Sequence, residues 1–169
     1  NTHVPFHITA QGRITNVTST MPATGSLQVG QKRPLATFTF SGAALPDVAL
    51  SLDALTPHIA SDGVKLTSIT IGDGSPVNTA SCSTDPAVPD LISCDILPEA
   101  LRRIPATLTV YADVALLSGK TSGSVQLSLT TPGTVGVLGD VFWSDGTGDY
   151  RWVDIAAPLA EGTRWTVTP

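Results

Sequence analysis

Apolar and hydroxyl-bearing residues alternate along most of this chain with a period of two. The segment 107–114, TLTVYADV, shows the pattern without interruption, and the segments 36–40, 64–71 and 125–129 repeat it. Successive side chains of a β-strand point to opposite faces of a sheet. The alternation therefore predicts strands that bury one face and expose the other.

Turn-forming residues interrupt this alternation at short intervals. Glycine, proline and aspartate recur about every 8–12 residues, which is typical of a β-sandwich or barrel. Weaker alternation predicts further strands at 4–10, 13–20, 27–29, 135–143, 150–155 and 164–168, with a hairpin loop at 145–149. We predict an all-β fold, an immunoglobulin-like or jelly-roll-like sandwich of about ten short strands, formed by residues 1–169 as a single domain.

Three segments depart from the alternation. Residues 43–62 fit either a strand or one to two helical turns, with prolines on both sides. Residues 75–95 are rich in serine, aspartate and proline and predict a long surface loop. Residues 98–103 predict a short helical connection.

The composition agrees with this assignment. Charged residues make up 14% of the chain, which holds only two glutamates and three lysines. Long helices carry such residues on their exposed face, so an α-rich fold is not expected. With a net charge of −5 and no cluster of basic residues larger than a pair, nucleic-acid binding is not expected either. No apolar run approaches the ~20 residues that span a bilayer, so we expect no membrane span.

Cys82 and Cys94 are the two cysteines of the chain, twelve positions apart. A zinc site requires more ligands, and no histidine lies nearby. We expect a disulfide that closes the 75–95 loop, with two unpaired buried thiols as the alternative. A disulfide implies an oxidising, extracellular compartment. Asn16, in the triplet Asn-Val-Thr, is a candidate N-glycosylation site, which is consistent with export.

Catalytic and metal-binding residues are sparse. Nucleophilic catalysis requires a base beside a nucleophile, and the only histidines are His3, His7 and His58, with no Gly-x-Ser-x-Gly elbow in the sequence. We therefore expect no enzymatic activity. No cofactor is expected apart from calcium, for which Asp145 and Asp149 are candidates because calcium takes oxygen ligands from loops. Ordinary solvated turns are the alternative.

Three aromatic residues gather near the C-terminus among several aspartates. Trp143, Tyr150 and Trp152 would form a sugar-binding face if their rings were exposed. Alternatively, they fill the core between two sheets, where aromatic side chains bury large apolar areas.

Five segments carry a resemblance to a known family, namely ATFTFSG (36–42), VKLTSITIGDG (64–74), IPATLTVYADV (104–114), SGSVQLSL (122–129) and FWSDGTGDYRW (142–152). In these segments the chain resembles the immunoglobulin-like modules of prokaryotic surface and S-layer-associated proteins. The resemblance implies an immunoglobulin-like sandwich in a cell-surface protein. The residues 43–62 and the cysteine loop depart from it as insertions.

The layout is also similar to that of secreted fibre subunits of the TasA and camelysin type, which polymerise by lending an N-terminal strand to a neighbour. Here Val4, Phe6, Ile8 and Ala10 would fill the neighbour's pockets, and residues 1–12 would form the exchangeable strand. An ordinary first strand of a self-contained sandwich is the alternative.

These observations lead to a structural function outside the cell. We predict a non-enzymatic subunit of a surface filament, matrix fibre or S-layer-like assembly, whose main partner is another copy of itself. A carbohydrate-binding or adhesion module is the first alternative, with polysaccharide or other surface proteins as partners. A spacer domain of a large surface protein is the second.

Overall fold

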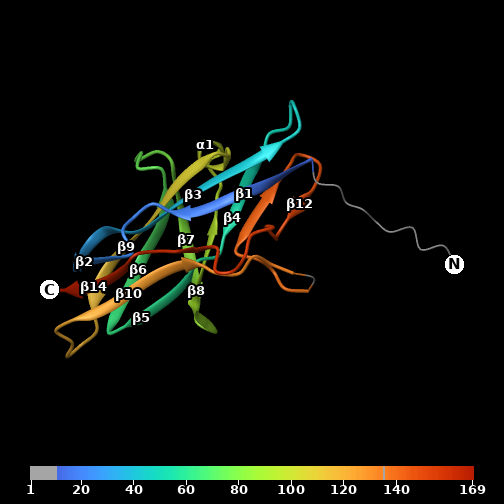
Figure 1. Cartoon of the computed structure of the whole chain (residues 1–169). Helices are drawn as coiled ribbons and strands as arrows, with labels where there is room; N and C mark the ends of the chain where they lie inside the picture. The colour runs from blue at the N-terminus through green and yellow to red at the C-terminus, as the bar shows by residue number, and fades with distance from the viewer. Residues whose placement is uncertain (1–10, 135) are drawn as a thin grey trace.

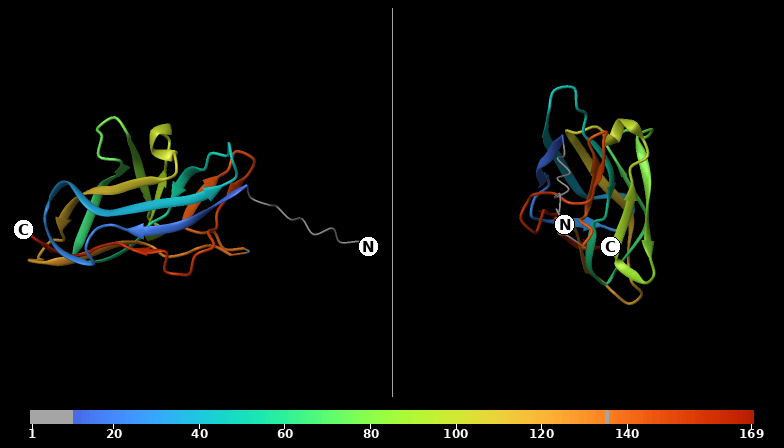
Figure 2. Two further views of the ribbon diagram at one scale, coloured as in Figure 1. Left: turned by 45° about the horizontal axis from the view of Figure 1, so that its top comes forward. Right: turned by 90° about the vertical axis from the view of Figure 1, so that its right-hand side faces the viewer.

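The computed structural model describes residues 11–134 and 136–169, which form an all-β structure with one short helix. The strands curl into two layers around a common interior, as Figures 1 and 2 show. This confirms the predicted fold class. The predicted N-terminal strand 4–10 lies outside the described residues. No helix in the described ranges is long and apolar enough to cross a membrane.

Each layer is a sheet of five main strands. The first layer consists, in spatial order, of β1 (Gly12–Ser19), β3 (Gly30–Ala44), β9 (Ala106–Leu116), β6 (Val64–Gly72) and β7 (Thr79–Asp85). The second consists of β8 (Val88–Asp95), β5 (His58–Asp62), β10 (Gly123–Leu129), β14 (Arg164–Thr168) and β2 (Thr24–Gln28). The smaller elements are β4 (Ser51–Leu55), β11 (Val141–Ser144), β12 (Asp149–Tyr150), β13 (Ala160–Glu161) and helix α1 (Glu99–Arg102).

The strand order is that of an immunoglobulin-type sandwich. The neighbours β1-β3-β9-β6 correspond to strands A-B-E-D of that fold, and β5-β10-β14 correspond to C-F-G. After β1 the chain changes layer, and β2 pairs in parallel with the last strand, β14. All seven strands of the framework are therefore supplied by residues 12–168, without a strand from outside.

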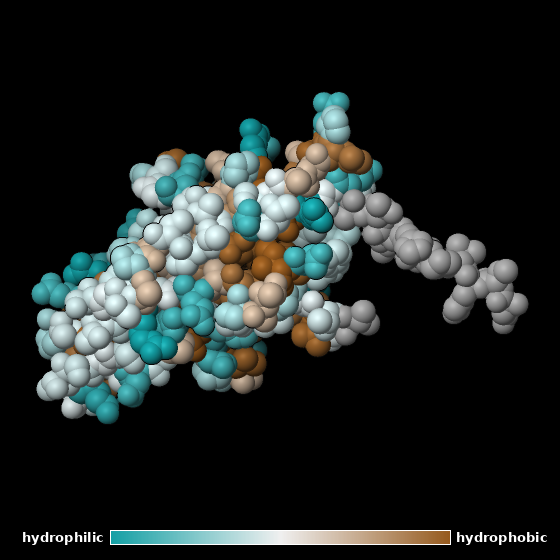
Figure 3. Space-filling model, viewed as in Figure 1, coloured by the Kyte–Doolittle hydropathy of each residue, from teal (hydrophilic) through white to brown (hydrophobic). Residues whose placement is uncertain are grey.

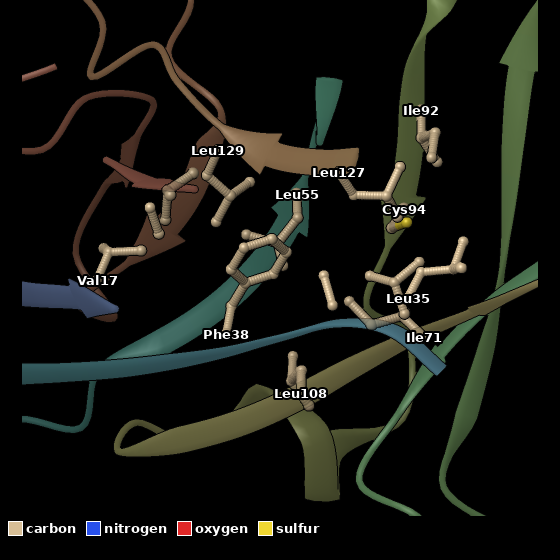
Figure 4. Packing of buried hydrophobic residues seen from close by; sticks show 14 of the residues in the cluster. Val17, Leu35, Phe38, Leu55, Ile71, Ile92, Cys94, Leu108, Leu127 and Leu129 are labelled. Atoms are coloured by element: carbon tan, nitrogen blue, oxygen red, sulfur yellow. The ribbon is translucent and has the colours of Figure 1, made fainter. Parts of the chain in front are cut away.

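The core forms where the apolar faces of the two sheets meet. Phe38 and Phe40 of β3 and Leu108 of β9 face Leu127 and Leu129 of β10, and all five are at most 1% exposed. Figure 4 shows several of these side chains pointing toward one another between the layers. Burying one such side chain stabilises the fold by roughly 1.5–3 kcal/mol, which is why the two-residue alternation determines the layer structure.

Most of the segment 75–95 is a β-hairpin, formed by residues 79–95, and the prediction of a long loop was wrong. Strands β7 and β8 pair in antiparallel fashion, with Cys82 directly opposite Cys94. Few apolar residues mark these strands because one of their faces is exposed to solvent. The predicted disulfide is confirmed, but it joins two paired strands instead of closing a loop. For this chain separation it contributes about 2–3 kcal/mol by restricting the unfolded chain.

For residues 43–62, the structure confirms the strand alternative. It places two strands there, β4 and β5, separated by Thr56 and Pro57. Another prediction needs correction. The predicted strands 135–143 and 150–155 shorten to β11 and β12. Outside these two short strands, the backbone makes isolated hydrogen bonds, such as Gly139 N to Arg151 O at 2.8 Å and Val153 N to Pro132 O at 2.9 Å, instead of a continuous ladder. The turn between them, the helical connection near 98–103 and the last strand, 164–168, are as predicted.

Candidate functional site

One end of the sandwich carries nearly all the additions to the seven-stranded framework. The register Phe40↔Ala106 places the end of β3 beside the start of β9, and Ser128↔His58 places the end of β10 beside the start of β5. The long connections between these strands therefore gather at one end, where Figure 1 shows β4 and β12. We call the segments 45–57, 96–105 and 130–163 the elaborated end.

Apolar side chains remain exposed at this end. The exposed fractions are 60% for Leu45, 79% for Leu97, 53% for Val137, 59% for Leu138 and 45% for Trp152. Figure 3 shows the corresponding brown surface over the turn that follows β3 and over the 132–139 loop. A concentration of exposed apolar residues on loops held by a rigid scaffold is typical of an interaction site.

The rings of Trp143, Tyr150 and Trp152 form a series of contacts that runs from the core to the surface. Trp143 is 1% exposed and Tyr150 6%, so neither can stack on a sugar, whereas Trp152 is 45% exposed. The rings of Trp143 and Tyr150 are 4.6 Å apart, and the ring of Trp152 meets Tyr150 edge-on at 6.5 Å. The Trp143 indole N–H donates to the Trp152 carbonyl at 2.9 Å. The predicted aromatic face is therefore reduced to Trp152, with the other two rings as its support.

Two aliphatic residues lie on the segment beside Trp152. Val153 N donates to Pro132 O at 2.9 Å and Gly139 N donates to Arg151 O at 2.8 Å, so the 132–139 loop runs along residues 151–153. A β-carbon on Gly133 would approach the Trp152 Cβ to 3.0 Å, which shows how closely the two segments pack. We call Val137, Leu138 and Trp152 the apolar tip.

Asp145 fastens the tip region to the first strand. Its Oδ2 accepts hydrogen bonds from the Gln11 backbone N–H at 2.8 Å and the Tyr150 hydroxyl at 3.2 Å. Its Oδ1 accepts from the Thr147 N–H at 2.9 Å, the Thr147 hydroxyl at 2.8 Å and the Gly148 N–H at 3.0 Å. Burial acts to raise the pKa of Asp145, but the hydrogen bonds from Gln11, Thr147 and Gly148 outweigh it and lower that pKa far below its usual value.

The same cluster raises the pKa of Tyr150. Burial disfavours the phenolate, and the neighbouring Asp145 carboxylate disfavours it further. The lowered pKa keeps Asp145 ionised at neutral pH, and the raised pKa keeps Tyr150 protonated.

Calcium binding by this cluster stays a prediction. Both Asp145 oxygens already receive protein donors, and Asp149 lies exposed at the start of β12. In the described ranges no three His, Cys, Asp or Glu side chains are close enough together to hold a metal ion.

A second buried aspartate, Asp140, joins the junction of β4 and β5 to the segment that follows β10. Its Oδ1 accepts from the His58 Nε2 at 3.0 Å and the Thr56 hydroxyl at 3.1 Å. Its Oδ2 accepts from the backbone N–H groups of Thr130 at 2.7 Å and Thr131 at 2.9 Å. The hydroxyl of Thr130 also donates to this aspartate, at 3.4 Å. The other two histidines, His3 and His7, lie outside the described residues.

A shallow groove beside α1 was not foreseen from the sequence. It has a volume of about 490 Å³ and is lined by Leu50, Leu97, Glu99 and Arg103, among others. Arg102 at its margin is paired with Asp53 at 2.6 Å. No local motif marks the groove, because its walls come from β4 and α1, about 50 residues apart in the sequence.

The remaining predicted site residues do not join this end. Asn16 lies exposed on β1, in the first layer, so the glycosylation acceptor is accessible. The donor residues Val4, Phe6, Ile8 and Ala10 lie outside the described residues.

No family model and no curated protein matches this sequence. Among solved structures, the chain is similar to the cohesin module of a family 33 glycoside hydrolase from Clostridium perfringens ATCC13124, with 11% identity, a TM-score of 0.46 and coverage of 95% of this chain and 98% of that one. It is also similar to a non-cellulosomal cohesin from the hyperthermophilic archaeon Archaeoglobus fulgidus, with 11% identity, a TM-score of 0.42 and coverage of 95% of this chain and 93% of that one. The third ScaB cohesin of R. flavefaciens, solved in complex with a group 1 dockerin, matches with 10% identity, a TM-score of 0.29 and coverage of 96% of this chain and 98% of that one.

TM-scores of this size establish neither a shared family nor a shared function. The resemblance to TasA-like and camelysin-like fibre subunits is not confirmed by these comparisons and stays a prediction.

Proposed function

We propose that this chain is a non-catalytic, extracellular recognition module that binds a protein partner through its apolar tip. The observation that supports this proposal most directly is the position of Trp152, which is half exposed beside the loop that carries Val137 and Leu138. Its ring contacts Tyr150, whose ring in turn packs on Trp143. Tryptophan is among the residues that dominate binding energy at protein interfaces. The Cys82–Cys94 disulfide supports an extracellular location, since disulfides persist in oxidising compartments.

The surroundings of Trp152 favour a protein over a carbohydrate. A sugar ring requires hydrogen-bonding groups around the aromatic face on which it stacks, because each hydroxyl that loses water must find a partner. The neighbouring segment instead presents Val137 and Leu138, both more than half exposed. Side chains of this kind lose little on desolvation and match the apolar centre of a protein interface.

Rigidity is the second requirement, and the two buried aspartates meet it. Asp145 fixes the 145–149 turn to Gln11, and Asp140 fixes residues 130–131 to the β4–β5 junction. Val137 and Leu138 lie between these two anchors along the chain, and Trp152 follows the 145–149 turn by three residues. Because little conformational entropy remains to be lost there, more of the contact energy contributes to affinity.

Replacing Trp152 with alanine is expected to weaken partner binding by about 30-fold or more, equivalent to about 2 kcal/mol, while leaving the melting temperature nearly unchanged. A photoreactive residue at position 138 would identify the protein bound at the tip on the producing cells. Titration calorimetry with that purified partner would then compare the wild type with Trp152→Ala. Thr166→Ala changes an exposed residue of β14, in the second layer. This variant is the matched control and should bind like the wild type.

Two results would contradict binding of a protein through the apolar tip. Unchanged affinity of the Trp152→Ala variant would refute binding through the tip. If position 138 crosslinks to no protein but Trp152→Ala loses retention on insoluble polysaccharide, the module binds carbohydrate instead.

A specific observation favours a second candidate, the predicted filament subunit. Within the described ranges β1 pairs only with β3, so its other edge is free to accept a strand. Because the seven-stranded framework is complete without residues 1–10, a neighbour's strand would extend this edge and not replace a missing strand. Val4, Phe6, Ile8 and Ala10 of one copy would then pair along β1 of the next, and such a head-to-tail contact would produce a fibre.

Deleting residues 1–10 tests this second candidate. The wild type should form filaments visible by negative-stain electron microscopy, and the truncated chain should form none while keeping its circular-dichroism spectrum. Filaments of unchanged length and number from the truncated chain would contradict strand addition, as would a wild type that stays unassembled.

A further inference from the structure

A small pocket lies on the outer face of the first layer. It has a volume of about 210 Å³ and is lined by Lys32 of β3, Tyr111 of β9, Thr79 of β7, and Gly74 and Ser75 of the turn between β6 and β7. Figure 2 shows this turn, in green, standing out from the layer. We call these five residues the lysine pocket.

Both neighbours of β9 carry a bulge at the level of Tyr111. On the β3 side the register is shifted around Lys32, and on the β6 side it is shifted around Ser68. Each of these two residues lies in the left-handed region, with a φ of 50°. That conformation is unfavourable for a residue with a β-carbon, and bulges often redirect side chains next to functional sites. Strain on both sides of one residue therefore points to a site here.

The bulge in β3 brings the Lys32 ammonium to the pocket. Tyr111 points outward, because its neighbours Val110 and Ala112 are buried, and the Lys32 Nζ lies 5.8 Å from the centre of its ring. The Asp113 carboxylate accepts the Lys32 backbone N–H at 2.9 Å, which holds the bulge in place. No carboxylate in the described part of the chain lies within ion-pair distance of this ammonium. Its charge is therefore available to a ligand.

The lining of the pocket favours an anionic ligand. It offers one ammonium and three hydroxyl groups, those of Ser75, Thr79 and Tyr111, and no acidic residue, although the chain has a net charge of −5. The aspartate of the adjoining turn, Asp73, already accepts hydrogen bonds from the Ser75 N–H at 2.9 Å and the Asn78 side-chain amide at 3.0 Å.

Charge and hydrogen bonding narrow the class of anion. One ammonium matches the single charge of a carboxylate, whereas a phosphate group carries about two charges and is usually held by several charged donors. The hydroxyl groups of the pocket suit a ligand that itself carries hydroxyl groups, because each of these must find a partner when it leaves water. A sugar acid combines both properties.

From these observations we propose that the lysine pocket binds one uronic acid unit of an acidic polysaccharide. Lys32 binds the carboxylate, and Ser75 and Thr79 exchange hydrogen bonds with the sugar hydroxyls. Pockets for drug-sized ligands have volumes of about 300–1,000 Å³, so this smaller one accommodates a single unit. The proposal uses no residue of the apolar tip, and either proposal can fail without the other.

Titration of the ¹⁵N-labelled full chain with sodium glucuronate, followed by NMR at constant ionic strength, tests the proposal. The backbone signals of Lys32, Ser75 and Thr79 should shift, with a dissociation constant of about 1 mM because few groups make contact. Glucose has the same ring without the carboxylate, and acetate has the carboxylate without the ring. Each should bind about tenfold more weakly than glucuronate, or worse.

Lys32→Met removes the ammonium, retains the length of the side chain, and should weaken glucuronate binding by about tenfold or more. Lys65→Met is the matched control, because Lys65 lies exposed on β6 opposite Ala115 and does not line the pocket. This variant should bind like the wild type. Thr79→Val removes one hydroxyl group with little change of shape and should weaken binding by about threefold to tenfold. It provides a second test if Lys32→Met does not fold.

The absence of any shift up to about 20 mM glucuronate would overturn the proposal, as would equal affinity for glucose and glucuronate. Equal weakening by Lys32→Met and Lys65→Met would show general attraction between charges instead of a site. Acetate that binds as tightly as glucuronate would show a site for carboxylates of any kind and would refute sugar recognition. Trp152→Ala should leave glucuronate binding unchanged, and a loss in this variant would assign the sugar to the apolar tip.

Discussion

A Gly162→Ala variant should unfold with a free energy about 3–4 kcal/mol below that of the wild type. Gly162 is buried where the chain enters β14, against the backbone of β10. An alanine Cβ would lie far inside van der Waals contact with the Leu127 carbonyl oxygen and 3.2 Å from the Ala36 Cβ. The backbone of β10 cannot rotate away as a side chain would, so the segment around residue 162 must move.

That movement would break two hydrogen bonds. Gly162 N donates to the Leu127 carbonyl at 2.9 Å, and the Gln126 side-chain amide donates to the Gly162 carbonyl at 2.8 Å. Their loss adds to the steric penalty and loosens β14, together with the parallel pairing of β2 against it. Urea unfolding followed by tryptophan fluorescence measures the effect.

Gly148→Ala is the matched control for this measurement. Its new Cβ would meet only the side chain of Tyr150, at 3.1 Å from the hydroxyl oxygen, and a shift of a few tenths of an ångström would relieve the contact. We expect a loss of about 1 kcal/mol or less for this variant. Equal midpoints for Gly162→Ala and the wild type would show that the close approach of β14 and β10 does not constrain the fold.

Asp145→Ala is expected to lower the free energy of unfolding by about 3 kcal/mol. The substitution removes the acceptor for the Tyr150 hydroxyl, which is buried, and for the backbone N–H groups of Gln11 and Gly148. The 145–149 turn would then lose its connection to the start of β1. Asp149→Ala, which removes an exposed carboxylate from the same turn, should change stability by less than about 0.5 kcal/mol.

We expect the free energy of unfolding to depend on pH in a way that identifies the charged form of Asp145 as the source of this stability. An unfolded aspartate has a pKa near 3.9, and the folded pKa of Asp145 is far lower. A depressed pKa means that the unfolded chain binds the proton first as the pH falls. The contribution is therefore complete above about pH 5 and is lost progressively as the pH falls below about 4 toward the folded value.

Asp145→Asn separates the charge from the shape of the side chain. The asparagine variant should be less stable than the wild type at pH 7, and the difference should shrink between about pH 5 and pH 2 because only the wild type loses an ionised group. Chemical unfolding at a series of pH values measures it. Parallel stability curves for the two proteins would show that the carboxylate does not act through its charge.

The hydrogen bonds around Asp145 connect stability to the proposed binding site. The carboxylate fixes Tyr150, and Tyr150 supports the ring of Trp152 at the surface. An Asp145 variant should therefore weaken partner binding as well as folding, whereas Trp152→Ala should weaken binding alone. This difference separates a residue that positions the tip from one that contacts the partner.

The sequence alone determined the class of the fold and its disulfide bond. The alternation at 107–114 and 36–40 correctly placed β9 and the centre of β3. In a strand with one buried face, each residue is apolar or polar according to the face on which it lies. The spacing of Cys82 and Cys94 correctly indicated a disulfide. Local chemistry was also sufficient at 145–149, where aspartate and glycine favour a tight turn.

Only the tertiary structure decided which segments are neighbours and which aromatic residues are exposed. Backbone hydrogen-bonding groups are the same in every residue, so alternation cannot reveal that β2 pairs in parallel with β14 or that residues 79–95 form a hairpin. Asp145 and Gln11 are 134 positions apart, and no local pattern links them. Trp143 and Trp152 look equivalent in the sequence, yet one is buried and the other exposed, because exposure depends on packing between distant segments.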